Sequence, residues 1–384
     1  MNSGLQGRVE ARLRALADGG LCRSLRPPSG IDLSSNDYLG LAGHPLLRHN
    51  MIEAIQQDGC GSTGSRLLRG HRASFDTVEQ AFAVWKGTER ALYFSSGYLA
   101  NLAVLTTFAE PGDVILGDRL NHASLREGVR LSFARRVVFR HNDVHSLERL
   151  LASTRGRGQV FVVTESLFSM DGDIPPLGEY GRLCREAGAL LVVDEAHAVG
   201  VYGASGSGLI EDAGIARDVF VSINTAGKAL GVAGAFVAGP AWAIEYLVQR
   251  ARPFVFSTAP PPALAAALTT SMALVAAEPE RRMRLRDRAT RLRRCLAAAG
   301  IAIPAGSSQI IPVLIGEATR TVAVAEALQS AGFDVRAIRP PTVAAGTARL
   351  RLSAKADLSD AVMDQFIDAL AAALEESKCY AGSS

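Results

Sequence analysis

The sequence predicts an α/β fold with one large, mostly parallel sheet that carries helices on both faces, followed by a smaller C-terminal α+β domain. Two observations predict this fold. Short apolar runs alternate with helix-like segments between residues 91 and 238, and from about residue 260 long helices and shorter strands replace that rhythm. The predicted parts are an N-terminal helical arm and strand at 1–40, a large α/β domain at 41–258 and a C-terminal α+β domain at 259–384.

The elements of the large domain follow from the spacing of apolar residues. An amphipathic helix at 5–17 and a short strand from residue 31 come first, and a helix at 73–85 places its apolar side chains on one face. Continuous apolar runs are typical of strands buried on both faces of a parallel sheet. Strands are expected at 91–94, 114–116, 136–139, 160–163, 190–193, 219–223 and 235–238, with helices from the turn at 95–98 to about 108 and at 123–131, 144–152 and 177–187.

The C-terminal pattern is different. Two long helices are expected from about 260 through 299, then strands at 310–314, 334–338 and 349–352 and helices at 321–331 and 358–376. The uncharged run at 259–277 is the segment most similar to a membrane span. Because prolines open it and threonine and serine interrupt it, a buried helix is expected instead, and no membrane contact is predicted.

The composition is typical of an ordinary soluble globular protein. Apolar residues make up 48% and charged residues 21% of the chain, and the net charge of +3 comes from scattered basic residues. No basic stripe suggests a nucleic-acid partner. Five widely spaced cysteines show no zinc spacing, so no metal site is predicted, and a reduced, cytoplasmic chain is expected. The N-terminal residues lack the apolar core of a signal peptide.

Lys228 is the first candidate for chemistry. The chain has four lysines, and three of them occur in polar sequence typical of surface lysines. Lys228 instead follows the apolar run 219–223 and lies between Gly227 and Gly231. A desolvated lysine loses its charge more easily, and a neutral amine forms a Schiff base with an aldehyde. A solvated lysine in a glycine turn is the alternative, and this stretch alone does not separate the two.

Asp194 is the second candidate, because it ends the apolar run 190–193 and His197 follows it closely. Ligands of parallel sheets bind beyond the carboxyl ends of the strands. An acid at that edge, with a lysine at the edge of a later strand, suits pyridoxal phosphate, whose protonated ring nitrogen pairs with an acid. The alternative is a helix cap after a strand. Glycines at 203–208 lack the GxGxxG order of a dinucleotide-binding turn.

Several sequence blocks occur together in one order. They are 34–41 (SSNDYLGL), 118–124 (DRLNHAS), 168–173 (FSMDGD), 194–197 (DEAH), 225–228 (TAGK), 337–343 (AIRPPTV) and 346–351 (GTARLR). From about residue 34 to its end, the chain resembles the α-oxoamine synthase family of fold-type I pyridoxal phosphate transferases. Each block is moderately specific, and the ordered set is highly specific.

This resemblance implies roles for individual residues. Lys228 would bind the cofactor and move protons at the substrate, Asp194 would pair with the ring nitrogen, and His197 with the ring hydroxyl. His122 would stack on the ring, although by itself it reads as an ordinary helix start, and Ser169 would reach the ring hydroxyl or the incoming carbonyl. The remaining implied residues are Ser96, Gly97, Tyr98 and Thr225 for the phosphate, Thr258 for a neighbouring subunit's phosphate, and Arg349, Asn36 and Arg23 for substrate.

Two of these assignments leave alternatives. Arg351 shares a strand face with Arg349, so only one of them need bind the amino-acid carboxylate. Arg26 competes with Arg23 for the carboxylate of the acyl chain, because the short N-terminal segment does not align clearly.

The resemblance also implies a reaction and partners. Family members condense an amino acid with an acyl thioester and release carbon dioxide. Block 338–343 points to the biotin-synthesis branch, which uses L-alanine and pimeloyl-CoA or pimeloyl-acyl carrier protein. Branches that use glycine or serine remain alternatives, as does a cofactor-binding protein without turnover. A homodimer with shared active sites is expected, with the loop 256–258 reaching the neighbouring subunit.

Overall fold

The computed structural model describes residues 3–154, 156 and 158–378, and the chain divides into two compact units. Unit 1 is Met1–Ser35, Met170–Gly172 and Arg284–Ser384, and unit 2 is Asn36–Ser169 and Asp173–Met283. The predicted boundaries after residues 40 and 258 differ from these units. The N-terminal arm groups with the C-terminal residues, and the segment 259–283 groups with the large sheet.

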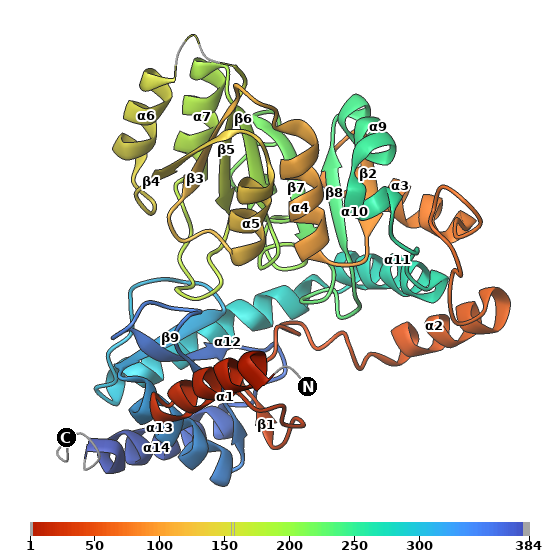
Figure 1. Cartoon of the computed structure of the whole chain (residues 1–384). Helices are drawn as coiled ribbons and strands as arrows, with labels where there is room; N and C mark the ends of the chain where they lie inside the picture. The colour runs from red at the N-terminus through yellow and green to blue at the C-terminus, as the bar shows by residue number, and fades with distance from the viewer. Residues whose placement is uncertain (1–2, 155, 157, 379–384) are drawn as a thin grey trace. The chain divides into compact units, whose positions relative to one another are not determined.

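Unit 2 is built on a seven-stranded sheet (Figure 1). Strand β8 is antiparallel to both of its neighbours, and the other pairings are parallel. The sheet is therefore mostly parallel, as the apolar runs predict. In order across the sheet, the strands are β2 (Arg90–Phe94), β8 (Ala235–Gly239), β7 (Val219–Thr225), β6 (Leu190–Asp194), β5 (Val160–Glu165), β3 (Val114–Asp118) and β4 (Arg135–Phe139).

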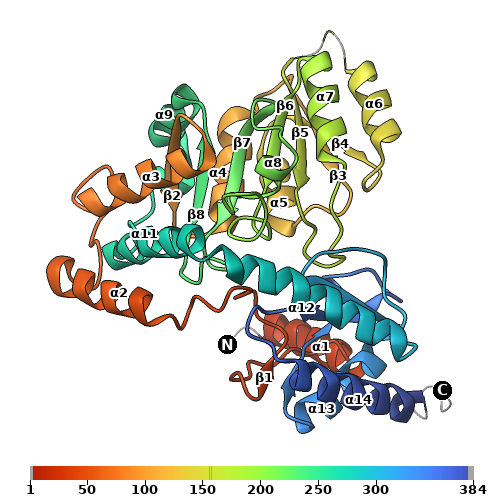
Figure 2. The ribbon, with the colours of Figure 1, turned by 180° about the vertical axis from the view of Figure 1, so that it is seen from behind.

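Helices cover both faces of this sheet. On the face toward the viewer in Figure 1 lie α4 (Gly97–Phe108), α5 (Ala123–Leu131), α9 (Ala241–Arg250) and α10 (Arg252–Val255). They enclose a core with the inward side chains of the central strands, including Ile115, Val163, Val192, Val221 and Val237. On the opposite face, seen in Figure 2, lie α3 (Ala73–Lys86), α6 (Val144–Ser153), α7 (Leu177–Ala187) and α8 (Leu209–Asp212).

Two further helices complete unit 2, namely α2 (Pro45–Asp58) and α11 (Pro262–Ala277). The side chains of Asn50 and Thr270 join them through a 2.7 Å hydrogen bond, and Ser271 Oγ donates to the carbonyl of Leu230 at 2.7 Å. These bonds explain why the uncharged run groups with the large sheet. Over the described residues, no helix is long and apolar enough to cross a membrane.

Unit 1 contains a three-stranded antiparallel sheet in the order β11 (Ala337–Ile338), β12 (Ala348–Ser353) and β9 (Ile310–Gly316). A second small sheet pairs β1 (Ile31–Asp32) with β10 (Phe333–Asp334) in parallel. The helices of this unit are α1 (Ser3–Asp18), α13 (Ala318–Ser330), α14 (Asp360–Glu376) and most of α12 (Pro279–Ala298). The core includes Leu33, Leu296, Val324, Leu350 and Phe366.

The single strand expected at 334–338 is wrong, because the structure has two short strands there. Strand β10 pairs with β1, and β11 pairs with β12 in the other sheet. The chain turns between them, where the Val335 amide donates to the Phe333 carbonyl at 3.0 Å. Apolar alternation predicts extended backbone but does not specify which neighbour each half pairs with.

Candidate active site

The candidate residues of unit 2 follow the carboxyl ends of its parallel strands. Ser96 comes after β2, His122 after β3, Ser169 after β5, His197 after β6 and Lys228 after β7. The carboxyl ends of parallel strands meet at one edge of a sheet, which is where such folds bind ligands. The sheet therefore brings together residues that are far apart in the sequence.

Lys228 takes part in a continuous hydrogen-bonded chain. Its Nζ is 2.9 Å from His197 Nε2, and His197 Nδ1 is 2.7 Å from the Tyr38 hydroxyl. Tyr38 in turn donates to Asn36 Oδ1 at 3.0 Å. Because the hydroxyl proton points to Asn36, we assign the imidazole proton to Nδ1, which leaves Nε2 to accept from Lys228.

Asp194 is buried at the end of β6 with both oxygens satisfied. Its Oδ2 accepts from Asn101 Nδ2 at 2.8 Å, and its Oδ1 accepts from the Ala196 amide at 2.9 Å. Asn101 also donates to Ser124 Oγ at 2.8 Å. Neither Asn101 nor Tyr38 was predicted as a site residue from the sequence. The signal for Asn101 is a buried polar residue in a mostly apolar helix.

His122 caps the N-terminus of α5. Its amide donates to Glu165 Oε1 at 2.6 Å, and its Nδ1 is 2.7 Å from Ser124 Oγ. Burial lowers the pKa of His122, with the Asp194 charge opposing and the Lys228 charge adding to the effect, so the neutral imidazole is favoured. Burial, followed by the negative charge of Asp194, raises the pKa of Glu165 to about 8. The carboxyl edge of the sheet therefore combines the neutral imidazole of His122 with the carboxyl group of Glu165, which keeps its proton near neutral pH.

The N-terminus of α4 approaches the end of β7 closely. A Cβ on Gly97 would lie 2.3 Å from Thr225 Oγ1, so any larger residue would force the Thr225 side chain to move. Ser96 caps the helix by accepting from the Leu99 amide at 3.2 Å, and Tyr98 is partly exposed. The first amides of a helix lack partners within it and attract a phosphate.

Two predicted residues of unit 2 have less defined surroundings. Ser169 is half-buried in the loop after β5, and Thr258 is exposed in the segment between α10 and α11. Neither position identifies a ligand by itself.

Arg349 and Arg351 belong to strand β12 of unit 1, and both are buried. Arg349 Nη1 is 2.5 Å from Asp171 Oδ1, and its Nε donates to the Thr347 carbonyl at 3.0 Å. Arg351 Nη1 donates to Ser353 Oγ at 2.9 Å. The charge of Arg349 is thus already paired with a carboxylate.

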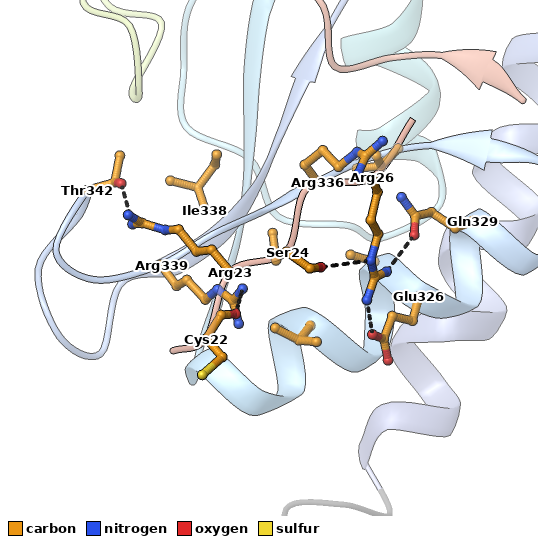
Figure 3. Close-up of a pocket in the computed structure, with 14 residues that line it drawn as sticks. Cys22, Arg23, Ser24, Arg26, Glu326, Gln329, Arg336, Ile338, Arg339 and Thr342 are labelled. Atoms are coloured by element: carbon orange, nitrogen blue, oxygen red, sulfur yellow. Dashed lines mark hydrogen bonds and ion pairs between the residues drawn. The ribbon is translucent and has the colours of Figure 1, made fainter. Parts of the chain in front are cut away.

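A cavity of about 350 Å³ in unit 1 contains Arg23 (Figure 3). Arg23 Nη2 donates to Thr342 Oγ1 at 3.2 Å, and Arg339 donates to the carbonyls of Gly20 and Cys22. Among the described residues, neither of these two arginines has a carboxylate partner. They leave uncompensated positive charge on one side of the cavity.

The other arginines of this cavity are neutralised. Arg26 contacts Glu326 at 3.3 Å, and Arg336 contacts Asp334 at 2.6 Å. Figure 3 shows Arg26 between Glu326 and Gln329, away from Thr342. Arg26 is therefore already paired with a carboxylate, whereas Arg23, over the part of the chain that the structure describes, is not.

Comparison with known proteins agrees with the fold. The model of the family "Aminotransferase class I and II" matches residues 28–370. The chain therefore belongs to this family, and within it to the 8-amino-7-oxononanoate synthase group, to which its similar curated relatives belong.

Two of those relatives are 8-amino-7-oxononanoate synthases. The protein of Anaeromyxobacter sp. (strain K) is 47% identical, with 96% of each chain covered. The protein of Geobacter sulfurreducens is 43% identical, with 94% of this chain and 97% of the relative covered.

Solved structures give a second comparison. Serine palmitoyltransferase from Sphingomonas wittichii has a TM-score of 0.91 at 32% identity, with 99% of each chain covered. Another serine palmitoyltransferase structure, solved with PLP, has a TM-score of 0.91 at 30% identity, covering 98% of this chain and 99% of that chain. 8-amino-7-oxononanoate synthase from Francisella tularensis has a TM-score of 0.78 at 28% identity, covering 92% and 99%.

Proposed function

We propose that this protein acts as an 8-amino-7-oxononanoate synthase, joining L-alanine to a pimeloyl thioester with pyridoxal phosphate as cofactor. The observation that carries the proposal is the chain Lys228–His197–Tyr38 beside the buried Asp194. Identities of 43–47% to relatives with that name support this choice within the family. Specificity depends on site residues more than on fold, so this sequence likeness outweighs the higher TM-scores to serine palmitoyltransferases.

The residues of unit 2 fit pyridoxal phosphate. The close approach of Gly97 to Thr225 leaves helix amides and a hydroxyl for a phosphate, and Asp194 supplies a buried carboxylate for a ring nitrogen. Lys228 would hold the cofactor through Nζ, His197 would bind the ring hydroxyl, and His122 would cover one ring face. When bound, the cofactor supplies an electron sink for negative charge at the substrate α-carbon.

Proton transfer is the task of Lys228. As a free amine, it takes the proton from the α-carbon of L-alanine and later returns one to the product. His197 Nε2, 2.9 Å away, orients this amine, and the bonds through Tyr38 to Asn36 hold the imidazole in the required tautomer. The carboxylate of Asp194 would pair with the ring nitrogen of the cofactor, and Asn101 Nδ2 orients that carboxylate by donating to its Oδ2.

The overall reaction balances without any redox partner. A carbon–carbon bond forms between the α-carbon of alanine and the acyl carbon, while the carbon–sulfur bond of the thioester breaks. The carboxyl group leaves as carbon dioxide, and a proton takes its place at the α-carbon. The products are 8-amino-7-oxononanoate, carbon dioxide and the free thiol.

The amino-acid carboxylate requires a cationic partner, for which Arg349 remains our assignment. Its ion pair with Asp171 means that a substrate must compete for the guanidinium, which gives Arg351 on the same strand face a comparable claim. The variants R349K and R351K separate the two. Lysine cannot form the bidentate pair that arginine forms with a carboxylate. Replacing the arginine that binds the substrate carboxylate should therefore raise the KM for L-alanine by about tenfold or more.

The free carboxylate of the pimeloyl chain is assigned to Arg23 in the cavity of unit 1. Arg339 adds positive charge there, and Thr342 adds a hydroxyl. The variant R23Q should raise the KM for a pimeloyl thioester by about tenfold, yet leave an uncharged heptanoyl thioester unaffected. R26Q serves as the control because Arg26 is already paired with Glu326. Equal effects of R23Q on both thioesters would remove Arg23 from this role.

The decisive assay supplies the purified protein and cofactor with pimeloyl-CoA or pimeloyl-acyl carrier protein and one amino acid at a time. Thiol release, carbon dioxide and product mass are measured with L-alanine, glycine and L-serine. A preference for L-alanine supports the proposal. A preference for serine would instead favour the second candidate, a serine palmitoyltransferase-like activity, for which the TM-scores of 0.91 argue. A preference for glycine would indicate another α-oxoamine synthase.

We also propose a homodimer in the cytoplasm. Exposed Leu5, Val9, Leu13 and Leu16 form an apolar stripe along α1, which a second subunit would cover. Sedimentation on dilution should reveal no active monomer. An active monomer would refute the shared-site assembly and the assignment of Thr258 to a neighbouring phosphate, and cell fractionation tests the location.

A further inference from the structure

His141 contacts none of the residues assigned above, yet each of its ring nitrogens faces a carboxylate. Nδ1 is 2.9 Å from Asp118 Oδ1, and Nε2 is 2.7 Å from Asp173 Oδ2. Carboxylates only accept hydrogen bonds, so both contacts are satisfied when both ring nitrogens carry a proton. This geometry therefore selects the imidazolium form.

The first carboxylate shapes the turn that leads to His122. Asp118 ends β3, its Oδ1 also accepts from the Leu120 amide at 2.8 Å, and its carbonyl accepts from the Asn121 amide at 3.2 Å. The next residue is His122, whose amide is held by Glu165. A change in the orientation of Asp118 would therefore be passed directly to the start of α5.

The second carboxylate closes the loop that carries Ser169. The Phe168 amide donates to the carbonyl of Asp173 at 3.0 Å, so the two ends of this loop are joined. The ring of His141 meets the ring of Phe168 edge to face, with centroids 4.5 Å apart and an interplanar angle of 88°. One imidazole thus contacts both ends of the loop, while Asn142 Nδ2 adds a 2.6 Å bond to Asp173.

We propose that His141, as an imidazolium between Asp118 and Asp173, is a positioning residue that holds the His122 turn and the Ser169 loop in their catalytic arrangement. The inference rests on the proposed function, since that function gives His122 and Ser169 their roles. Asp118 ends β3 and Asp173 lies in the loop after β5. A single cation between these two anions fixes two segments relative to each other, whereas a neutral imidazole, with one N–H, would donate to only one of them.

The charge environment of His141 supports this role. Burial alone would lower its pKa, but hydrogen bonds and charge from Asp118 and Asp173 raise the pKa of His141 to about 9. The neighbouring elements contribute Asp143 at the start of α6 and Tyr180 of α7. Burial, then the charges of Asp118, Asp143 and Asp173, raise the pKa of Tyr180, so it stays a neutral phenol. The imidazolium is therefore retained at neutral pH.

The test uses the cofactor-loaded enzyme with the variants H141F and H141Q. Phenylalanine keeps the ring against Phe168 but removes both N–H donors, and glutamine retains one amide donor. His145, whose side chain is 91% exposed on α6, provides the matched control H145Q. We expect H141F to lower kcat by about 10- to 100-fold, because a misplacement near 1 Å has that effect. KM should change by less than about threefold, as expected for loss of transition-state positioning.

Two further readouts separate positioning from a general structural role. The circular dichroism of the bound cofactor should change in H141F and not in H145Q. The kcat advantage of the wild type over H141F should shrink as pH rises past about 9, where the imidazolium loses its proton. If H141F does not fold, D173N replaces it in this test, because it removes one of the two anions. Its folding is checked by far-UV circular dichroism, and its kcat and cofactor dichroism should match those of H141Q.

Failure of this inference is distinguishable from failure of the proposed function. If the wild type condenses no amino acid with a pimeloyl thioester, the function is wrong, while nitrogen NMR of the cofactor-loaded protein still reports whether His141 is an imidazolium at neutral pH. A neutral imidazole would overturn the inference, and so would an H141F enzyme with wild-type kcat and cofactor dichroism.

Discussion

Replacing Lys86 by methionine should destabilise the protein strongly, although the polar sequence around this residue predicts a surface lysine. That expectation was wrong. The Lys86 side chain is 2% exposed and forms an ion pair with Glu195, whose side chain is 0% exposed. Lys86 Nζ also donates to the Ser207 carbonyl at 2.7 Å, and Glu195 Oε1 accepts from the Ile210 amide at 2.9 Å.

The expected magnitude follows from this burial. K86M leaves Glu195 in the interior without its cation, and removing one partner of a buried pair costs about 3–5 kcal/mol. The double variant K86M/E195Q also removes the uncompensated charge, so it should recover a large part of the loss. The exposed pair of Lys378 and Glu375, with side chains 62% and 71% exposed, provides the control K378M, which should cost about 1 kcal/mol or less.

The free energy of unfolding is measured by urea unfolding of five proteins with saturating cofactor, namely the wild type, K86M, E195Q, K86M/E195Q and K378M. Tryptophan fluorescence and far-UV circular dichroism follow the first transition. A coupling energy of about 2–3 kcal/mol between positions 86 and 195 is expected from the double-mutant cycle. The reasoning fails if K86M is no less stable than K378M, or if the double variant is as unstable as K86M.

Three further predictions concern other contacts. The raised pKa of His141, about 9 against an ordinary 6.5, corresponds to a stabilising contribution of up to about 3 kcal/mol. This contribution is complete below about pH 6.5 and is lost as pH rises through about 9. The urea midpoints of the wild type and H141F should therefore converge at alkaline pH. D171N should lower the KM for L-alanine about threefold or more, because the substrate carboxylate no longer competes for Arg349; an unchanged KM would count against Arg349 as the carboxylate ligand. G97A should raise the dissociation constant of the cofactor by about tenfold or more, since its new methyl group would meet Thr225 Oγ1 at 2.3 Å; equilibrium dialysis showing wild-type affinity would refute the phosphate cradle.

Much of unit 2 could be predicted because burial leaves a local trace. Each strand of the large sheet was expected within about two residues of its observed bounds, a normal margin for strand ends. Strands covered on both faces are continuous apolar runs in the sequence, and a polar residue that ends such a run or follows it within a few residues lies near the carboxyl edge of the sheet. That rule locates Asp194 and Lys228 without any knowledge of their neighbours.

Supporting residues could not be found in this way. Tyr38 lies 159 positions from His197, and Asp171 lies 178 positions from Arg349. Lys86 has polar neighbours in sequence, and its burial arises from Glu195, 109 positions away. A local pattern reports the average environment of a segment, but it carries no information about a distant partner.

The sequence by itself determined the class of fold, the strand edge that carries the chemistry and the lysine at its centre, because hydrophobic periodicity and residue type are local properties. Only the tertiary structure decided which groups hold that lysine, which arginines are already paired and how two loops share one imidazolium. Those contacts depend on side chains that chain folding brings within about 3 Å of each other, the range at which hydrogen bonds form.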